Sequence, residues 1–146
     1  MPLKMEITQP HENGQQLLVV DDQPFFAAFL REKFEERGYS VATVGDAGEA
    51  LAYVSASTQP IVVLLDLMLP RVNGQQLLRE LARGPHASEL RVVLVSAHHT
   101  VETVAAHHPM VAGRAQKPVD LGELARMVAS AAQDLTAKAS LHAYEH

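Results

Sequence analysis

The chain has 146 residues, enough for one compact domain with a substantial core but too few for two ordinary domains. Hydrophobic residues make up 47%, as in globular proteins, and 12 basic and 17 acidic side chains give a formal net charge of −5. This charge disfavours direct contact with a nucleic-acid backbone. The absence of cysteine excludes disulfides and thiolate metal sites.

The N-terminal residues 1–16 are polar and include Pro2, Pro10 and Gly14, so they lack the apolar core of a secretory signal. No apolar run approaches the roughly 20 residues that a membrane span requires. We therefore expect a soluble cytoplasmic protein that is not inserted into a membrane.

Five short segments predict β-strands. Three of them are continuous apolar runs, which are typical of strands buried on both faces of a parallel sheet. The second segment is weaker, and the last is interrupted by Gly113. In chain order, the expected strands are residues 17–20, 40–44, 61–65, 92–95 and 111–116.

Helices are expected between these strands. The first begins near Pro24, a favoured first-turn residue, and stops at Gly38. Three others begin with a capping box, in which an Asp or Asn precedes a Glu or Gln by three residues. These boxes are Asp46–Glu49, Asn73–Gln76 and Asp120–Glu123. A weaker helix is expected over residues 100–107, and the last helix is expected to continue to about residue 137.

The alternation of strands and helices predicts an α/β fold with a doubly wound parallel sheet and right-handed crossovers. In such folds, ligands bind at the carboxyl ends of the strands, near the point where the strand order reverses. Five polar residues lie at these ends, directly after the apolar segments: Asp21, Asp22, Asp66, Ser96 and Lys117. We expect their side chains to converge on one edge of the sheet.

Three carboxylates that meet at one edge repel one another unless a cation is bound. A site made only of oxygen ligands, with room for water and phosphate, favours Mg²⁺ over Ca²⁺. Lys117 adds a positive charge and Ser96 a hydrogen-bond donor. Together these groups suit phosphoryl transfer with a carboxylate as the nucleophile.

Each residue also has an ordinary structural interpretation. Asp21 and Asp22 could cap the helix that follows them, and Asp66 could belong to a turn. Ser96 and Lys117 could simply be solvated. Their combined placement at successive strand ends favours a functional site.

Four stretches of the sequence, 17–24, 65–74, 95–97 and 117–118, resemble the receiver (response regulator) family of two-component signalling. The resemblance covers about residues 16–135. It implies a flavodoxin-like, five-stranded parallel sheet of order 2-1-3-4-5 with five helices. We expect a flexible extension at residues 1–15, a receiver domain at 16–137 and a C-terminal tail at 138–146.

The resemblance implies that Asp66 is the phosphoacceptor. It also implies that Mg²⁺ is bound by Asp22, Asp66 and the backbone carbonyl of Met68, with Asp21 acting mainly through a water molecule.

For the remaining site residues, the resemblance implies that Ser96 hydrogen-bonds the phosphoryl group and that Lys117 pairs with it. The Lys117–Pro118 peptide is expected to be cis. Met68 and His98 are expected to flank the pocket, where Met68 would shield the phosphoryl group and His98 would order water.

One position departs from the family pattern. Many receivers have Tyr or Phe three residues before the lysine, but this chain has Arg114 there. A charged guanidinium cannot be buried as an aromatic ring is, because its charge needs a partner. We therefore expect Arg114 to be an atypical switch position, with signal output passing through a rearrangement of residues 96–116.

The expected phosphoryl source is a sensor histidine kinase or a phosphotransfer protein, and the expected output is altered binding to a downstream protein that the sequence does not identify. No DNA-binding output domain is expected, and the oligomeric state is left open. The alternatives are a receiver from a phosphorelay or hybrid kinase and a pseudo-receiver interaction platform. An aspartate-nucleophile phosphatase is disfavoured, because Met68 occupies the usual position of its second carboxylate.

Overall fold

The computed structural model describes residues 14–71, 73–97 and 108–145, with side chains described as far as residue 137. The chain forms, in order, β1 (Gln16–Val20), α2 (Pro24–Glu35), β2 (Ser40–Val44), α3 (Ala47–Ala56), β3 (Ile61–Leu65), α4 (Gly74–Arg83), a short 3₁₀ helix η1 (Ala87–Glu89), β4 (Leu90–Ser96), β5 (Val111–Gln116) and α5 (Leu121–Glu145). The helix expected over residues 100–107 lies outside the described residues.

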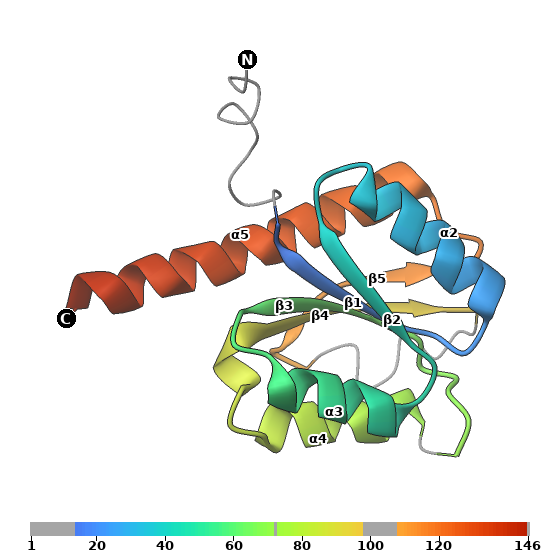
Figure 1. Ribbon diagram of the computed structural model, residues 1–146, viewed down its shortest axis with the longest axis horizontal. Helices are drawn as coiled ribbons and strands as arrows, with labels where there is room; N and C mark the ends of the chain where they lie inside the picture. The colour runs from blue at the N-terminus through green and yellow to red at the C-terminus, as the bar shows by residue number, and fades with distance from the viewer. Residues whose placement is uncertain (1–13, 72, 98–107, 146) are drawn as a thin grey trace.

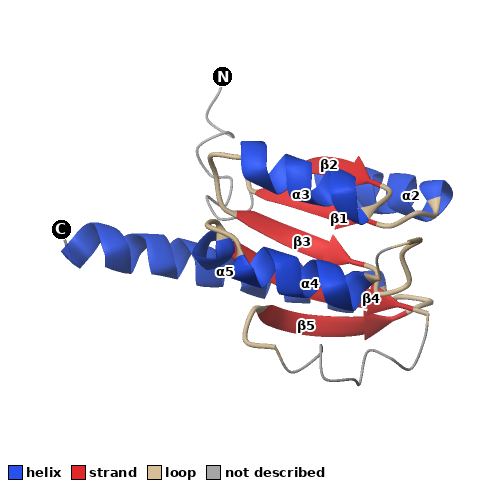
Figure 2. Cartoon of the chain, turned by 90° about the horizontal axis from the view of Figure 1, so that it is seen from below, coloured by secondary structure: helices blue, strands red, loops and turns tan. Residues whose placement is uncertain are grey.

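The five strands form one parallel sheet of order β2-β1-β3-β4-β5, which confirms the expected topology. Helices α2 and α5 cover one face of the sheet, and α3 and α4 cover the other (Figures 1 and 2). Every residue of β3 is buried, as expected for a central strand covered by helices on both faces.

The predicted helix starts are confirmed by their hydrogen bonds. In each of the three capping boxes, the side chain of the cap residue accepts a hydrogen bond from the backbone N–H three residues later. Pro24 is the first residue of α2, whereas Gly38 follows that helix in a left-handed conformation with φ of 99°.

Helix α5 extends further than the sequence indicated, because it ends at Glu145 instead of near residue 137. Its buried residues as far as Leu135 pack against the sheet, and the C-terminal end of the helix projects past the sheet in Figure 1. The segment after Gly122 contains no Gly or Pro and is rich in alanine, the strongest helix former. No helix in the described residues combines the length and apolarity that crossing a bilayer requires.

Strand β5 is irregular where the sequence pattern is weakest. Val111 pairs with Val92 and Gly113 pairs with Val93, so Ala112 is an extra residue in the ladder. A Cβ atom on Gly113 would lie 3.0 Å from the sulfur of Met127 in α5. The glycine thus allows α5 to pack closely on β5.

The loop between β3 and α4 also depends on a glycine. A Cβ atom on Gly74 would lie 2.5 Å from the Cα of Leu67 and 2.7 Å from the carbonyl oxygen of Asp66. The Gly74 N–H donates to the Leu67 carbonyl over 3.0 Å. The start of α4 therefore rests directly on the backbone that follows β3.

Replacing Gly74 with alanine should lower the free energy of unfolding by about 1–3 kcal/mol, because the new methyl group meets rigid backbone and not a flexible side chain. Urea denaturation measures this change. The matched control is Gly48→Ala in α3, where a Cβ atom comes no closer than 3.5 Å to a neighbour. That variant should gain about 0.5 kcal/mol. Equal effects of the two changes would contradict the close approach at Gly74.

Candidate functional site

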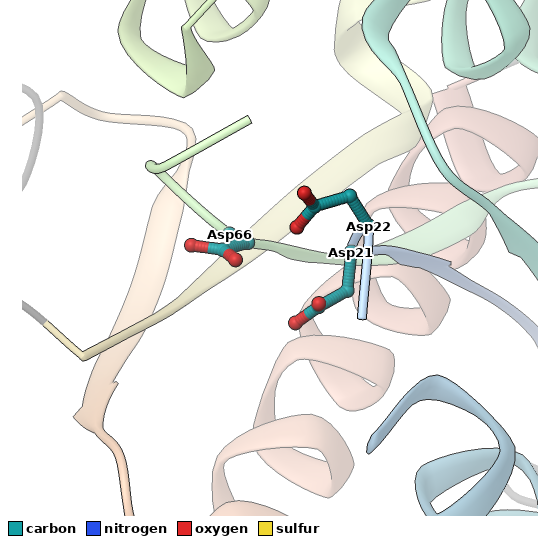
Figure 3. Close-up of side chains that lie close together, drawn as sticks. All are labelled: Asp21, Asp22 and Asp66. Carbon is teal, nitrogen blue, oxygen red and sulfur yellow. The ribbon is translucent and has the colours of Figure 1, made fainter. Parts of the chain in front are cut away.

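Three carboxylates meet at the carboxyl ends of adjacent strands. Asp21 and Asp22 directly follow β1, and Asp66 directly follows β3. One oxygen from each carboxylate lies within 4.8 Å of the others, and Figure 3 shows the three side chains together. The backbone holds them there, because Asp21 N–H donates to the Val44 carbonyl and Asp66 N–H donates to the Val20 carbonyl.

Asp21 is buried and both of its carboxylate oxygens have partners. Its Oδ1 accepts a hydrogen bond from the Gln23 backbone N–H over 2.9 Å, and its Oδ2 accepts one from Lys117 Nζ over 3.0 Å. The N-cap residue of α2 is Gln23, so the interpretation of Asp21 and Asp22 as caps of that helix is wrong. Asp22, by contrast, is exposed to solvent.

Asp66 is also buried, with 4% of its surface exposed. Its Oδ1 accepts a hydrogen bond from the Met68 backbone N–H over 2.9 Å, and its Oδ2 lies 3.4 Å from Lys117 Nζ. Burial raises the pKa of Asp66; the Met68 hydrogen bond and the Lys117 charge lower that pKa, while the Asp21 charge raises it again. The net pKa is raised, so burial outweighs the nearby positive charge.

Lys117 follows β5 and joins the same edge. Its backbone N–H donates to the Ser96 carbonyl over 2.9 Å. The Lys117–Pro118 peptide is cis, as the family resemblance implied. Ser96 is completely buried at the end of β4. The strand ends that carry the five predicted site residues therefore adjoin one another, as the parallel topology requires.

Two neighbours of Lys117 were not identified from the sequence. Gln23 Oε1 accepts a hydrogen bond from Lys117 Nζ over 2.8 Å, and the centroid of the Phe26 ring lies 4.5 Å from the same nitrogen. In the sequence, only the short distance of Gln23 and Phe26 from the acidic pair Asp21 and Asp22 points to a position near the site.

The structure describes two of the three residues that were expected to flank the pocket or to act as a switch. Met68 is 55% exposed beside Asp66, and Arg114 is exposed on β5, which lies at the edge of the sheet. His98 lies outside the described residues. The roles expected of Met68, Arg114 and His98 therefore remain predictions.

The donor set fits a hard divalent cation. Its oxygens come from carboxylates alone, and the exposed Asp22 provides access from solvent. Asp22 is the most accessible of the three possible ligands, and the contact of Lys117 Nζ with Asp66 Oδ2, at 3.4 Å, is longer than its contact with Asp21 Oδ2, at 3.0 Å. A bound Mg²⁺ would also offset the repulsion between these carboxylates.

The fold and this acidic edge define a doubly wound α/β module with a pocket of three carboxylates that suits a divalent cation. The model of the response regulator receiver domain matches residues 17–129, and the chain belongs to this family. Receiver domains of the family are signalling modules of two-component systems that are phosphorylated and bind Mg²⁺ at an acidic pocket. The Asp21, Asp22 and Asp66 cluster is compatible with such a pocket.

Among curated relatives, the response regulator MprA of Mycolicibacterium vanbaalenii is 36% identical over 113 residues, covering 76% of this chain and 48% of MprA. Protein PilH of Pseudomonas aeruginosa is 31% identical over 80 residues, covering 55% of this chain and 65% of PilH. The chain thus spans less than two thirds of the length of these relatives.

Solved structures show the same fold. The receiver domain of the Francisella response regulator 1452 superimposes with a TM-score of 0.72 at 26% identity, covering 83% of this chain and 98% of that one. TrrA of Thermotoga maritima, solved in complex with Mg²⁺ and BeF, superimposes with a TM-score of 0.70 at 24% identity, covering 80% and 98%.

The raised pKa of Asp66 predicts a pH-dependent stability. Ionisation of Asp66 is harder in the folded chain than in the unfolded chain, so its contribution to stability falls as pH rises from 3.8 through its folded pKa. In the presence of EDTA, Asp66→Asn should therefore become increasingly more stable than the wild type across this window, with the difference constant above it.

Urea denaturation at a series of pH values measures this difference. The matched control is Asp46→Asn at the start of α3, since asparagine caps a helix as well as aspartate does. A wild type that is more stable than Asp66→Asn at neutral pH without divalent ions would contradict the prediction.

Proposed function

We propose that Asp66 accepts a phosphoryl group from a phosphohistidine, with Mg²⁺ bound at the adjacent carboxylates. The observation that carries this proposal is the meeting of three carboxylates and one lysine amine at a single edge of the sheet. The complex of TrrA with Mg²⁺ and BeF, a protein of the same fold, supports it.

In the proposed reaction, a carboxylate oxygen of Asp66 attacks the phosphorus atom. A P–O bond forms, the P–N bond of the phosphohistidine breaks, and the imidazole leaves with the bonding electrons. The Met68 N–H and the Lys117 amine hold the Asp66 carboxylate from two sides. Bound Mg²⁺ would neutralise charge on the carboxylates and on the transferred group.

The other site residues have supporting roles in this proposal. Asp22, Asp66 and the Met68 carbonyl bind Mg²⁺, whereas Asp21, which has the shorter contact with Lys117 Nζ, acts through a water molecule. Ser96 hydrogen-bonds the phosphoryl group, and Lys117 pairs with it. Met68 and His98 flank the group and influence the rate of its hydrolysis.

The donor would be a sensor histidine kinase or a phosphotransfer protein, and the output would be altered binding to a downstream protein. We propose a cytoplasmic location for this exchange. A phosphatase that uses the same nucleophile is disfavoured, because the position two residues after Asp66 is the thioether Met68, which cannot act as an acid or base.

Acetyl phosphate tests the proposed reaction directly. With Mg²⁺ present, the wild type should gain one base-labile phosphoryl group, while Asp66→Asn should gain none and EDTA should abolish the gain. Intact-mass measurement over time gives the result, and Asp46→Asn serves as the phosphorylated control. An unmodified wild type would indicate a pseudo-receiver, and a phosphoryl group on Asp66→Asn would place the acceptor elsewhere.

The exposed Arg114 carries a second proposal, that the phosphorylation signal passes through residues 96–116 without a buried aromatic switch. A guanidinium on the edge strand cannot move into the core without a partner for its charge. The movement would instead involve residues 96–116. Ser96, at the start of this range, is buried beside the site.

Spectral comparison tests this route. Amide NMR spectra with and without Mg²⁺ and beryllium fluoride should show shifts across residues 96–116, while amides in α3 should change little. The same shifts should persist in Arg114→Ala, because the arginine would not be the moving group. Unchanged amides over 96–116 would contradict the proposal.

A further inference from the structure

The amine of Lys117 is surrounded by four side chains from three parts of the fold. Its Nζ lies 2.8 Å from Gln23 Oε1, 3.0 Å from Asp21 Oδ2 and 3.4 Å from Asp66 Oδ2. On another side, the centroid of the Phe26 ring is 4.5 Å away. An ammonium group has three N–H donors, so these three acceptors match its full donor capacity.

Gln23 makes the shortest of the three contacts, and its backbone is held by two hydrogen bonds. As the N-cap residue of α2, it accepts a hydrogen bond from the Ala27 N–H at its carbonyl over 3.0 Å. Its N–H donates to Asp21 Oδ1 over 2.9 Å. The backbone of Gln23 is thus anchored both to the helix start and to Asp21, and its exposed side chain extends from that anchored backbone to Lys117.

The chemistry of Gln23 suits a residue that holds Lys117 beside an incoming anion. Its amide oxygen accepts a hydrogen bond but carries no net charge, so it adds no repulsion toward a phosphoryl group. The Phe26 ring, which packs against the core shared by α2 and α5, attracts the ammonium through its π face. Neither Gln23 nor Phe26 has a nucleophilic side chain that could accept the phosphoryl group in place of Asp66.

We propose that Gln23 is a positioning residue for Lys117: together with Asp21, it fixes two N–H donors of the amine and directs the third toward Asp66. This inference rests on the proposed phosphorylation of Asp66. A phosphoryl oxygen on Asp66 then replaces the longest contact, the one of 3.4 Å, while the other two hydrogen bonds hold the amine in place.

The first test needs no phosphorylation. Gln23→Leu removes the acceptor but keeps the bulk of the side chain, whereas Gln23→Glu keeps an acceptor oxygen. Hydrogen exchange of the Lys117 ammonium, measured by NMR at low temperature, should be about tenfold faster in Gln23→Leu. It should return toward the wild-type rate in Gln23→Glu.

The matched control is Gln59→Leu, an exposed glutamine in the α3–β3 loop at the opposite end of the sheet. This variant should leave the exchange of the Lys117 ammonium unchanged. An unaltered exchange rate in Gln23→Leu would overturn the positioning role.

The second test follows phosphorylation by acetyl phosphate at saturating Mg²⁺. Gln23→Leu should lower the second-order rate constant about tenfold while leaving Mg²⁺ affinity, measured by titration, unchanged. Gln59→Leu should match the wild type in both measurements. A parallel loss of rate and Mg²⁺ affinity would show that Gln23 acts through the carboxylates, which would overturn the inference.

The two proposals fail in different ways. A wild type that gains no phosphoryl group contradicts the phosphorylation of Asp66 itself. A wild type that is phosphorylated, together with a Gln23→Leu variant that reacts at the same rate, contradicts only the positioning of Lys117.

Discussion

Asp21 and Asp66 are buried at the ends of neighbouring strands, where like charges repel and burial disfavours ionisation. Lys117 contacts both carboxylates and lessens the repulsion, yet the pKa of Asp66 remains raised. Three carboxylates lie beside one amine, so the site contains more negative charge than Lys117 alone offsets. That excess is the physical reason why it suits a divalent ion.

The order of the sheet produces this concentration of charge. The strand order reverses between β1 and β3, and the two strands place Asp21, Asp22 and Asp66 at one edge. Lys117 reaches the same edge from β5, two strands away from β3, because a lysine side chain is long. In parallel sheets of this kind, the strand reversal leaves a crevice between the crossover connections, where ligands bind.

Much of the fold follows from local patterns in the sequence. The strands at 40–44, 61–65 and 111–116 and the three capped helix starts have the predicted bounds, since apolar runs and caps are local signals. The bulge at Ala112 and the end of α5 at Glu145 depend instead on packing and on helix propensity without a stop signal. Convergence of the strand ends was predictable from topology, but the contacts of Gln23 and Phe26 with Lys117 depend on side-chain rotamers that no pattern encodes.

The backbone hydrogen bonds of Asp21 to Val44 and of Asp66 to Val20 continue the ladders of the sheet beyond its strands. The main chain of the two acidic residues is consequently tied to the sheet, and the hydrogen bonds that hold it break only when neighbouring strands separate. Repulsion between the Asp21 and Asp66 carboxylates therefore cannot be lowered by a movement of their backbone alone. The backbone positions of these two carboxylates are already set in the folded chain. Binding of a ligand there therefore requires little additional ordering of the protein, which lowers the free-energy cost of binding.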